Sequence, residues 1–310
     1  MFFIMGFFTL SLSAQSATLS RQSASTLEYN MEVDGLQREF IVKLPSVYNP
    51  ASDKTYPVVF MLHGGGGSGK KYYNISGWKE LGEREGIITV FPTGYKVCIK
   101  DGETGQAKTG NYWLTSNKSS QLCQGGQAHE DVNFIRAIAG FLGQNYKVDA
   151  SRFYLTGFSN GMGFTLDQVI PKLSDIFAAV GGTGSLIYQP VRASNPIPCL
   201  MMIGENDANM VRRRGNQALP ITAQAIQQDE WLQELLALHT NLLQVANDPI
   251  IEEKRKHTNV LYNQATNGGN QILQFAVLKG LGHVYPRGIP EHNNIRAAEI
   301  FWNFFQEYQK

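Results

Sequence analysis

The stretch RFYLTGFSNG, residues 152–161, decides the fold. An apolar, strand-forming run at 152–156 leads into Gly157-Phe158-Ser159-Asn160-Gly161, which fits the pattern G-x-S-x-G. In this pattern a serine lies on a sharp, strained turn between a strand and a helix. Side chains two residues before and after it would collide, so glycine is needed at both places. The stretch therefore predicts a strand, a tight turn that exposes Ser159, and a helix.

A serine hydroxyl is a weak nucleophile and needs a general base. In folds built around this turn, the chain order is serine, then Asp or Glu, then histidine. The histidines after the serine are His239, His257, His283 and His292. His283 lies in the glycine-rich segment 280–283, directly after a predicted strand at 272–278, which is where the base is expected. His239 and His257 are predicted to lie on the surface, and His292 near the start of the last helix. We therefore take His283 as the base.

The acid of such a set should follow the apolar run at 197–203. The segment Gly204-Glu205-Asn206-Asp207 offers two carboxylates there, and either could hold and stabilise the imidazole. The spacing alone does not choose between Glu205 and Asp207.

Glycines also follow the predicted strand at 57–62, in the segment His63-Gly64-Gly65-Gly66-Gly67. Glycines let the backbone approach a substrate closely and point N–H groups at a developing negative charge. We expect this segment to form one side of an oxyanion hole. The N–H of Asn160, the residue after the serine, would supply the other donor. His63 is then a structural residue that holds the loop.

Two other motifs are interpreted as structural. Residues 64–70 fit G-x-x-x-x-G-K, the start of a phosphate-binding loop, but Lys71 stands where Ser or Thr should coordinate magnesium, and no clear helix follows. The cluster His129-Glu130-Asp131 is typical of a helix start rather than a metal site. The sequence therefore implies no metal and no cofactor. Tyr112 and Trp113 could line a substrate pocket or pack a loop down.

Strands alternate with helices along the rest of the chain. The central strands are uniformly apolar, which indicates a mostly parallel sheet with helices on both faces. Further strands are predicted at 26–33, 38–44, 87–91 and 177–180, and helices at 78–85, 131–146, 222–245 and 295–308. Residues 93–128 are predicted to be a long irregular stretch.

Composition narrows the function classes. The 310 residues carry 27 basic and 26 acidic side chains, a net charge of +1, which gives no field to attract nucleic acid. Residues 2–12 are apolar and small residues follow, which predicts a signal peptide at 1–16 and one catalytic domain at 17–310. A buried N-terminal strand is the alternative. No segment predicts stable membrane insertion.

The three cysteines fit export from the cytoplasm. Cys98 and Cys123 flank a loop rich in Gly, Ser and Asn, and a disulfide between them would stabilise the fold by roughly 3–4 kcal/mol. Cys199 lies in an apolar run and is predicted to be a buried thiol.

Taken together, the chain resembles the family of polyhydroxybutyrate depolymerases and feruloyl esterases, carbohydrate esterase family one of the α/β-hydrolase superfamily. The resemblance runs across nearly the whole chain after residue 16. Its segments are PVVFMLHGGGG (57–67), ITVFPTGY (88–95), HEDVNFI (129–135), VDASRFYLTGFSNGM (148–162), FAAVGG (177–182), MIGENDANM (202–210) and GLGHVYPRG (280–288).

The resemblance implies an α/β-hydrolase fold with Ser159 as nucleophile, Asp207 as acid and His283 as base. The choice of Asp207 over Glu205 comes from the resemblance alone. It also implies Gly65 and Asn160 as oxyanion-hole donors. The region after Asp207, with Arg212-Arg213-Arg214, departs from the family pattern and is expected to shape the rim of the pocket.

The expected function is a secreted serine esterase, periplasmic or extracellular, that hydrolyses carboxylic esters through an acyl-enzyme. Expected substrates are feruloyl or acetyl esters, either small molecules or esters linked to plant polysaccharide, with Trp113 as a candidate substrate contact. The alternatives are an extracellular polyhydroxybutyrate depolymerase, a peptidase of the same fold, and an inactive hydrolase-fold binding protein. A peptidase of this fold commonly carries a gating domain, for which we see no room. The intact Ser, Asp and His set argues against a binding protein.

Overall fold

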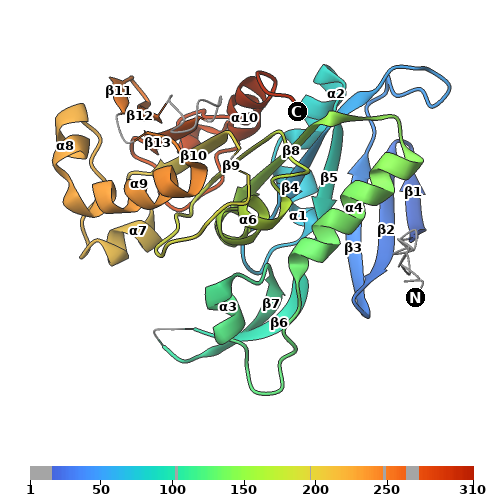
Figure 1. Ribbon diagram of the computed structural model, residues 1–310, viewed down its shortest axis with the longest axis horizontal. Helices are drawn as coiled ribbons and strands as arrows, with labels where there is room; N and C mark the ends of the chain where they lie inside the picture. Colours follow the sequence, from blue (N-terminus) through green and yellow to red (C-terminus); the bar gives the residue numbers. More distant parts are fainter. Residues whose placement is uncertain (1–15, 102–103, 196, 247–248, 263–271) are drawn as a thin grey trace, which may run out of the picture.

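The structure is a computed structural model that describes residues 16–101, 104–195, 197–246, 249–262 and 272–310. The predicted signal peptide at 1–16 lies almost entirely outside the described residues. An 11-stranded sheet runs through the molecule in the order β1-β2-β3-β5-β4-β8-β9-β10-β13-β12-β11 (Figure 1). Its strands are β1 Ala17–Ser23, β2 Thr26–Val33, β3 Leu36–Lys43, β4 Tyr56–Leu62, β5 Ile88–Pro92, β8 Val148–Phe158, β9 Ala179–Thr183, β10 Cys199–Gly204, β11 Ile250–Glu253, β12 His257–Tyr262 and β13 Leu273–Leu278.

The middle of the sheet is parallel and both flanks are antiparallel. The pairs β5–β4, β4–β8, β8–β9, β9–β10 and β10–β13 are parallel, whereas β1 to β3 and β11 to β12 add antiparallel strands at the two edges. Every residue of β4, β5, β9 and β10 is buried, as expected for strands covered on both faces. The predicted α/β-hydrolase architecture, a mostly parallel sheet between helices, is confirmed.

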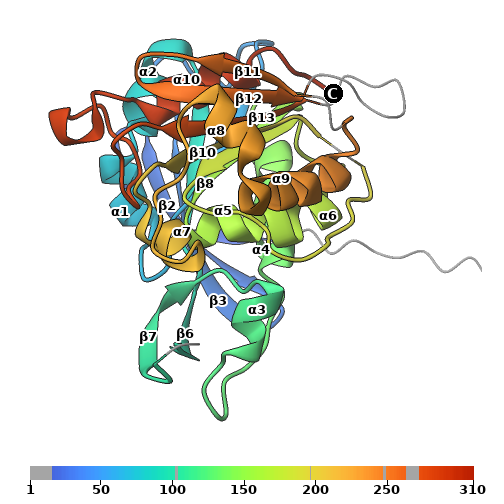
Figure 2. The same cartoon turned by 90° about the vertical axis from the view of Figure 1, so that its left-hand side faces the viewer.

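Helices cover both faces of this sheet (Figure 2). Helices α4 Asp131–Asn145, α5 Asn160–Phe164, α6 Ile170–Leu173, α8 Ala223–Gln228 and α9 Glu230–Leu243 pack into one hydrophobic core. Helices α1 Gly69–Ile75, α2 Trp78–Glu85 and α10 Ala297–Phe305 pack into a second core on the other face. Strand β4 serves both, because Phe60 belongs to the first core and its neighbour Met61 to the second.

Three sequence predictions need correction here. Residues 93–128 are not irregular: they contain the antiparallel hairpin β6 Tyr95–Lys100 and β7 Ala107–Tyr112, and helix α3 Ser116–Ser120. The predicted long helix at 222–245 is two helices, α8 and α9, because Asp229 ends α8 and its side chain caps the start of α9 through the N–H of Leu232. A helix, α1, does follow the glycine-rich segment 64–67, but the Lys70 ammonium pairs with Glu28.

The hairpin forms a small lobe that stands out from the rest of the molecule (Figures 1 and 2). A disulfide joins Cys98 to Cys123 within it, so the structure pairs the two cysteines that flank the loop. Cys199 is a free and fully buried thiol, as predicted, and burial raises its pKa.

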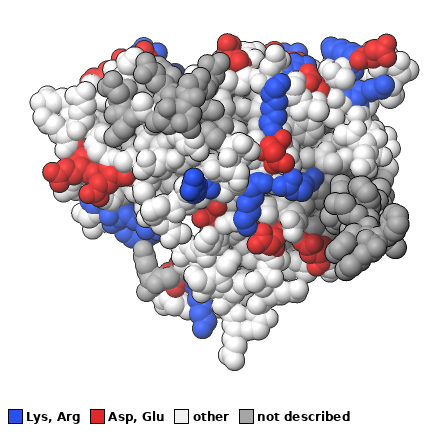
Figure 3. All heavy atoms as spheres, viewed as in Figure 1, with Lys and Arg blue, Asp and Glu red and all other residues white. Residues whose placement is uncertain are grey.

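The surface charge agrees with the balanced composition, and the described helices are short. Basic and acidic side chains are interspersed over the face shown in Figure 3, in keeping with the net charge of +1. None of the helices in the described ranges is long and apolar enough to cross a membrane.

Candidate active site

The turn after β8 has the strain that the G-x-S-x-G pattern predicts. Ser159 adopts φ 50° and ψ −116°, a conformation that residues with a side chain rarely adopt. A Cβ on Gly157 would lie 2.6 Å from the carbonyl carbon of Gly161, and a Cβ on Gly161 would lie 2.6 Å from the carbonyl oxygen of His63. The two glycines are therefore sterically required, and helix α5 begins directly after the serine.

Ser159, His283 and Asp207 are brought together by the ends of three strands of the sheet. The Ser159 Oγ lies 2.9 Å from His283 Nε2, and His283 Nδ1 lies 2.7 Å from Asp207 Oδ2. The Asp207 carboxylate is 1% exposed, whereas the His283 side chain is 22% exposed, so solvent reaches the imidazole but not the acid. A hydroxyl, an imidazole and a buried carboxylate in this order can activate the hydroxyl as a nucleophile.

Strand order explains why these residues meet. Ser159 follows β8, Asp207 follows β10 and His283 follows β13, and these strands are parallel members of one sheet. The carboxyl ends of parallel strands lie at the same edge, where open α/β sheets bind their ligands.

The structure also separates the two candidate acids. Asp207 contacts the imidazole, and its second oxygen accepts the N–H groups of Asn209 and Met210, which start helix α7 Ala208–Arg213. Glu205 instead accepts the Gly280 N–H at 2.6 Å and so joins the loops that follow β10 and β13. Asp207, as the resemblance implies, is the carboxylate placed against His283.

The two residues expected to supply the oxyanion-hole donors lie beside each other. A Cβ on Gly65 would lie 3.6 Å from the Asn160 Cβ, so the two residues are neighbours. The Asn160 N–H is the first of helix α5, and such groups have no partner within their own helix. In the described part of the chain, the Gly65 N–H has no hydrogen-bond partner, whereas the next two N–H groups bond to Asn111 and Gly64.

His63 holds the glycine-rich loop, as predicted. The Gly94 N–H donates to His63 Nε2 at 2.8 Å, so the proton is on Nδ1, which donates to the Gly64 carbonyl at 2.7 Å. Burial lowers the pKa of His63 to about 4, although the hydrogen bond to Gly64 acts in the opposite direction. The residue is therefore a neutral positioning group at pH 7.

Trp113 packs the loop rather than contacting substrate, which corrects the expectation of a pocket wall. Its side chain is fully buried, its Nε1–H donates to the His63 carbonyl at 3.0 Å, and its ring stacks on Phe164. Its neighbour Tyr112 is half-buried and leans against Gly65, where an added Cβ would lie 2.8 Å from the tyrosine ring.

Sequence reasoning did not find the second role of Asn160. Its side-chain amide accepts the Trp113 N–H and donates to the Trp113 carbonyl, both at 2.8 Å. This two-point clamp fixes the residue that is expected to supply the second oxyanion-hole donor. Asn209 was also missed: its amide nitrogen lies 3.4 Å from Nδ1 and 3.3 Å from Nε2 of His283.

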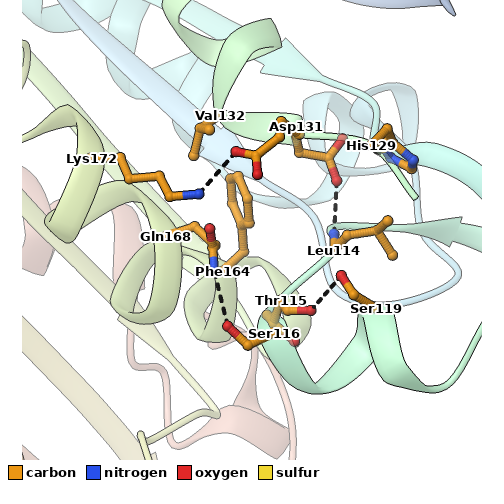
Figure 4. Close-up of a pocket in the computed structure, with 11 residues that line it drawn as sticks. Leu114, Thr115, Ser116, Ser119, His129, Asp131, Val132, Phe164, Gln168 and Lys172 are labelled. Carbon is orange, nitrogen blue, oxygen red and sulfur yellow. Dashed lines mark hydrogen bonds and ion pairs between the residues drawn. The ribbon is translucent and has the colours of Figure 1, made fainter. Parts of the chain in front are cut away.

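The cluster His129-Glu130-Asp131 is tied into salt bridges with Arg38 and Lys172. Figure 4 shows His129 and Asp131 beside a pocket, with Asp131 bonded to Leu114. The buried Asp131 carboxylate contacts the Arg38 guanidinium at 2.6 Å and accepts the Leu114 N–H at 2.7 Å. Burial alone would raise the pKa of Asp131, but the hydrogen bond from His129 and the charge of Arg38 lower it overall. The cluster lines a pocket of about 210 Å³ beside helix α4. It therefore supports the loop that carries Trp113.

The other histidines lie elsewhere, and one prediction about them is wrong. His239 is fully buried in α9 rather than on the surface, where its Nε2 accepts the Ile187 N–H at 3.1 Å. His257 is partly buried in β12. His292 lies in a short 3₁₀ turn before α10 and accepts the Arg287 N–H.

Comparisons with known proteins agree with the resemblance drawn from the motifs. No model of a known protein family matches the chain. The chain is 26% identical over 180 residues to the bifunctional acetylxylan esterase/xylanase XynS20E of Neocallimastix patriciarum, covering 58% of this chain and 23% of that protein. It is 28% identical over 207 residues to feruloyl esterase C of Emericella nidulans, covering 65% of this chain and 66% of that protein. The chain thus spans less than two thirds of the length of these relatives.

Solved structures show the fold. An acetyl xylan esterase from Aspergillus awamori superposes with a TM-score of 0.55 at 16% identity, over 87% of this chain and 94% of that one. An S-formylglutathione hydrolase from Agrobacterium tumefaciens gives 0.56 at 13% identity, over 95% and 99%. A ferulic acid esterase gives 0.51 at 16% identity, over 91% and 97%. The chain therefore has the α/β-hydrolase fold and is similar in sequence to esterases that are named for acetylxylan and feruloyl substrates.

Proposed function

We propose that this protein is a secreted serine esterase that hydrolyses acetyl or feruloyl esters of plant polysaccharide through an acyl-enzyme. The contact of 2.9 Å between Ser159 Oγ and His283 Nε2 carries the proposal. The likeness to an acetylxylan esterase and a feruloyl esterase supports the substrate class.

In the proposed mechanism, Ser159 Oγ attacks the ester carbonyl carbon while His283 Nε2 takes the hydroxyl proton. Asp207 keeps the imidazole oriented and stabilises the imidazolium that forms. The N–H groups of Gly65 and Asn160 bind the oxygen as it gains negative charge, which is worth about 10²–10³-fold in rate per donor.

The tetrahedral intermediate then collapses. The C–O bond to the alcohol breaks, and the imidazolium returns the proton to the leaving alkoxide, which leaves an acyl group on Ser159. A water molecule, deprotonated by His283, attacks the acyl carbon in the same oxyanion hole. In the collapse of this second intermediate, the bond between the acyl carbon and Ser159 Oγ breaks and the imidazolium returns its proton to Oγ, which releases the carboxylic acid and the free serine.

Two observations support secretion. The apolar run at 2–12 followed by small residues is typical of a signal peptide. The Cys98–Cys123 disulfide belongs to an oxidising compartment. Recovery of the protein from the periplasm or medium, shortened at its N-terminus, is the expected result; full-length protein retained in the cytoplasm would contradict this part of the proposal.

A serine variant tests the activity. Wild-type protein should release a burst of p-nitrophenol from p-nitrophenyl acetate, one molecule for each active site. The Ser159→Ala protein should show no burst. Ser151→Ala is the matched control, because Ser151 lies at the far end of the same strand β8 and bonds to Asp149. Equal, slow hydrolysis by wild type and Ser159→Ala would show a binding protein instead.

Release of acids from methyl ferulate, acetylated xylan and polyhydroxybutyrate tests the substrate class. We expect acid from one or both of the first two. Degradation of the polyester with methyl ferulate and xylan left intact would instead identify a polyhydroxybutyrate depolymerase.

A further inference from the structure

Helix α7 begins beside His283 and has arginines in its last turn. Its cap, Asp207, bonds to the imidazole, and the Asn209 amide lies against the same ring. Residues three and four positions further along a helix share a face, so Arg212 and Arg213 follow Asn209 within one turn. The Arg212 guanidinium donates a hydrogen bond to the side-chain oxygen of Asn209 at 3.4 Å. Both arginines are exposed, and their backbone lies about one helical turn beyond Asn209, the residue that contacts the imidazole.

A second segment meets α7 at this place. The loop after β9 starts at Gly184, where an added Cβ would lie 3.1 Å from His283 Cε1, and it reaches Tyr188 four residues later. The Tyr188 hydroxyl contacts the Met210 sulfur of α7 at 3.0 Å, and the ring is 39% exposed. The Arg213 guanidinium lies 4.3 Å above the centre of this ring. Stacking on an aromatic face holds the planar guanidinium in place and leaves its N–H groups free to bind a ligand.

Arg213 and Arg214 are neighbours in the sequence, but in the part of the chain that the structure describes only one of them pairs with a carboxylate. Arg214 pairs with Asp229 at the start of α9, so its charge is compensated within the protein. In the described ranges, Arg213 contacts no carboxylate and lies only on Tyr188. A run of solvated basic residues would show no such division, because each side chain would extend into water. An exposed guanidinium that is stacked and unpaired, on the helix whose cap contacts His283, matches the geometry that binds carboxylates.

We infer that Arg213, with Tyr188 as its support, forms a subsite that selects ester substrates bearing a carboxylate. The inference rests on the proposed esterase function and narrows its substrate class. The carboxylate could be carried by the acyl part of the ester or by the alcohol part. In either case it would lie on the Arg213 side of the imidazole, because Asn209 contacts His283 and Arg213 follows one helical turn later.

Two pairs of esters test the subsite and separate the two sources of charge. The acyl-borne pair is p-nitrophenyl hydrogen succinate against p-nitrophenyl butyrate. The alcohol-borne pair is 4-acetoxybenzoate against methyl 4-acetoxybenzoate. For each pair, the ratio of kcat/KM for the anionic ester to that for the neutral ester is measured in wild type, Arg213→Gln and Arg213→Glu. The matched control is Arg21→Gln, which removes one exposed positive charge from the edge strand β1.

We expect the ratio to fall roughly three- to tenfold in Arg213→Gln for at least one pair, and further in Arg213→Glu. It should stay at the wild-type value in Arg21→Gln. Raising the salt concentration from about 0.05 to about 0.5 M should reduce the wild-type preference, because an exposed ion pair is screened. The pair that responds identifies which part of the substrate carries the carboxylate.

Unchanged ratios for both pairs in Arg213→Gln and Arg213→Glu would overturn the subsite. If Arg21→Gln lowers the ratio as much as Arg213→Gln, the effect is one of overall charge and the subsite is also overturned. Failure of the esterase proposal is a separate result, because it would appear as hydrolysis of p-nitrophenyl butyrate that persists in Ser159→Ala.

Discussion

A methyl group at Gly161 should disturb both the fold and the reaction. Its Cβ would lie 2.6 Å from the carbonyl oxygen of His63 and 2.7 Å from that of Leu62. These are backbone atoms of β4 and of the loop that follows, so no side chain can rotate away. The shortfall from an ordinary contact is about 0.8 Å. Helix α5 and strand β4 would have to separate by a similar amount.

We expect Gly161→Ala to cost roughly 1–3 kcal/mol of folding free energy, the usual range for overpacking. For a chain of this size the melting temperature should fall by about 1.5–5 °C. The same displacement would move the Asn160 N–H away from Gly65. Since a misplacement of about 1 Å can cost a hundredfold in rate, kcat/KM for p-nitrophenyl acetate should fall by about two orders of magnitude.

Gly143→Ala is the matched control. Gly143 lies on the exposed side of helix α4, and an added Cβ would meet nothing within 4 Å. Alanine is the better helix former, so this variant should gain about 0.5–1 kcal/mol and keep full activity. Calorimetry and the p-nitrophenyl acetate assay measure both variants. A Gly161→Ala protein with the melting temperature and kcat/KM of the wild type would refute the steric reasoning.

Further predictions concern stability. Arg38→Met should cost roughly 3–5 kcal/mol in urea titrations at pH 7, because the buried Asp131 carboxylate loses its guanidinium partner, and adding Asp131→Asn should recover much of that; no recovery would contradict the assignment. Burial lowers the pKa of His239 to about 4 from 6.5, so the unfolded chain binds the proton first and stability should fall as the pH drops from 6.5 to 4, by roughly 3 kcal/mol. His239→Gln should reduce this slope, and a slope unchanged by the substitution would refute the cause. Replacing Cys98 and Cys123 by serine should cost at most about 3–4 kcal/mol and abolish the effect of dithiothreitol on the melting temperature; a melting temperature unaffected by dithiothreitol in wild type would refute a stabilising disulfide.

The central sheet and the grouping of the site were predictable from the sequence for one reason. Buried parallel strands are short apolar runs, and the turns after them carry the residues that meet at one edge. The positions of Ser159 and His283 followed from the glycines beside them, because each residue lies in a tight turn at the end of a strand. Even so, the spacing of Glu205 and Asp207 could not separate them, because the choice depends on whether a carboxylate points across to the loop after β13 or toward the imidazole.

Other features depend in whole or in part on tertiary contacts. His239 lies on the apolar face of α9, with Leu235, Leu236, Leu242 and Leu243 three and four positions away, so helical spacing could have predicted its burial. The Ile187 N–H that its Nε2 accepts comes from a distant loop and could not be predicted. In the hairpin at 95–112, strand β6 does alternate, with Tyr95, Val97 and Ile99 on one side and lysines on the other. Its partner β7 reads AKTGNY and shows no such alternation, so the pairing could not be predicted. From the sequence, Trp113 could line a pocket or pack a loop. Its backbone is held by the Asn160 side chain, a contact that the sequence does not show, and its ring is buried.

The four consecutive glycines at 64–67 have no side chains with which to hold their own shape. Neighbouring residues hold this segment in place. His63, directly before it, donates to the Gly64 carbonyl. Asn111 of the hairpin lobe accepts the Gly66 N–H and donates to the Gly67 carbonyl. The Cys98–Cys123 bond ties down that lobe. A nascent chain in a reducing cytoplasm would lack this tie, so its glycine loop would be looser there. The glycine loop would then take its final shape only after the chain enters an oxidising compartment, where the disulfide forms.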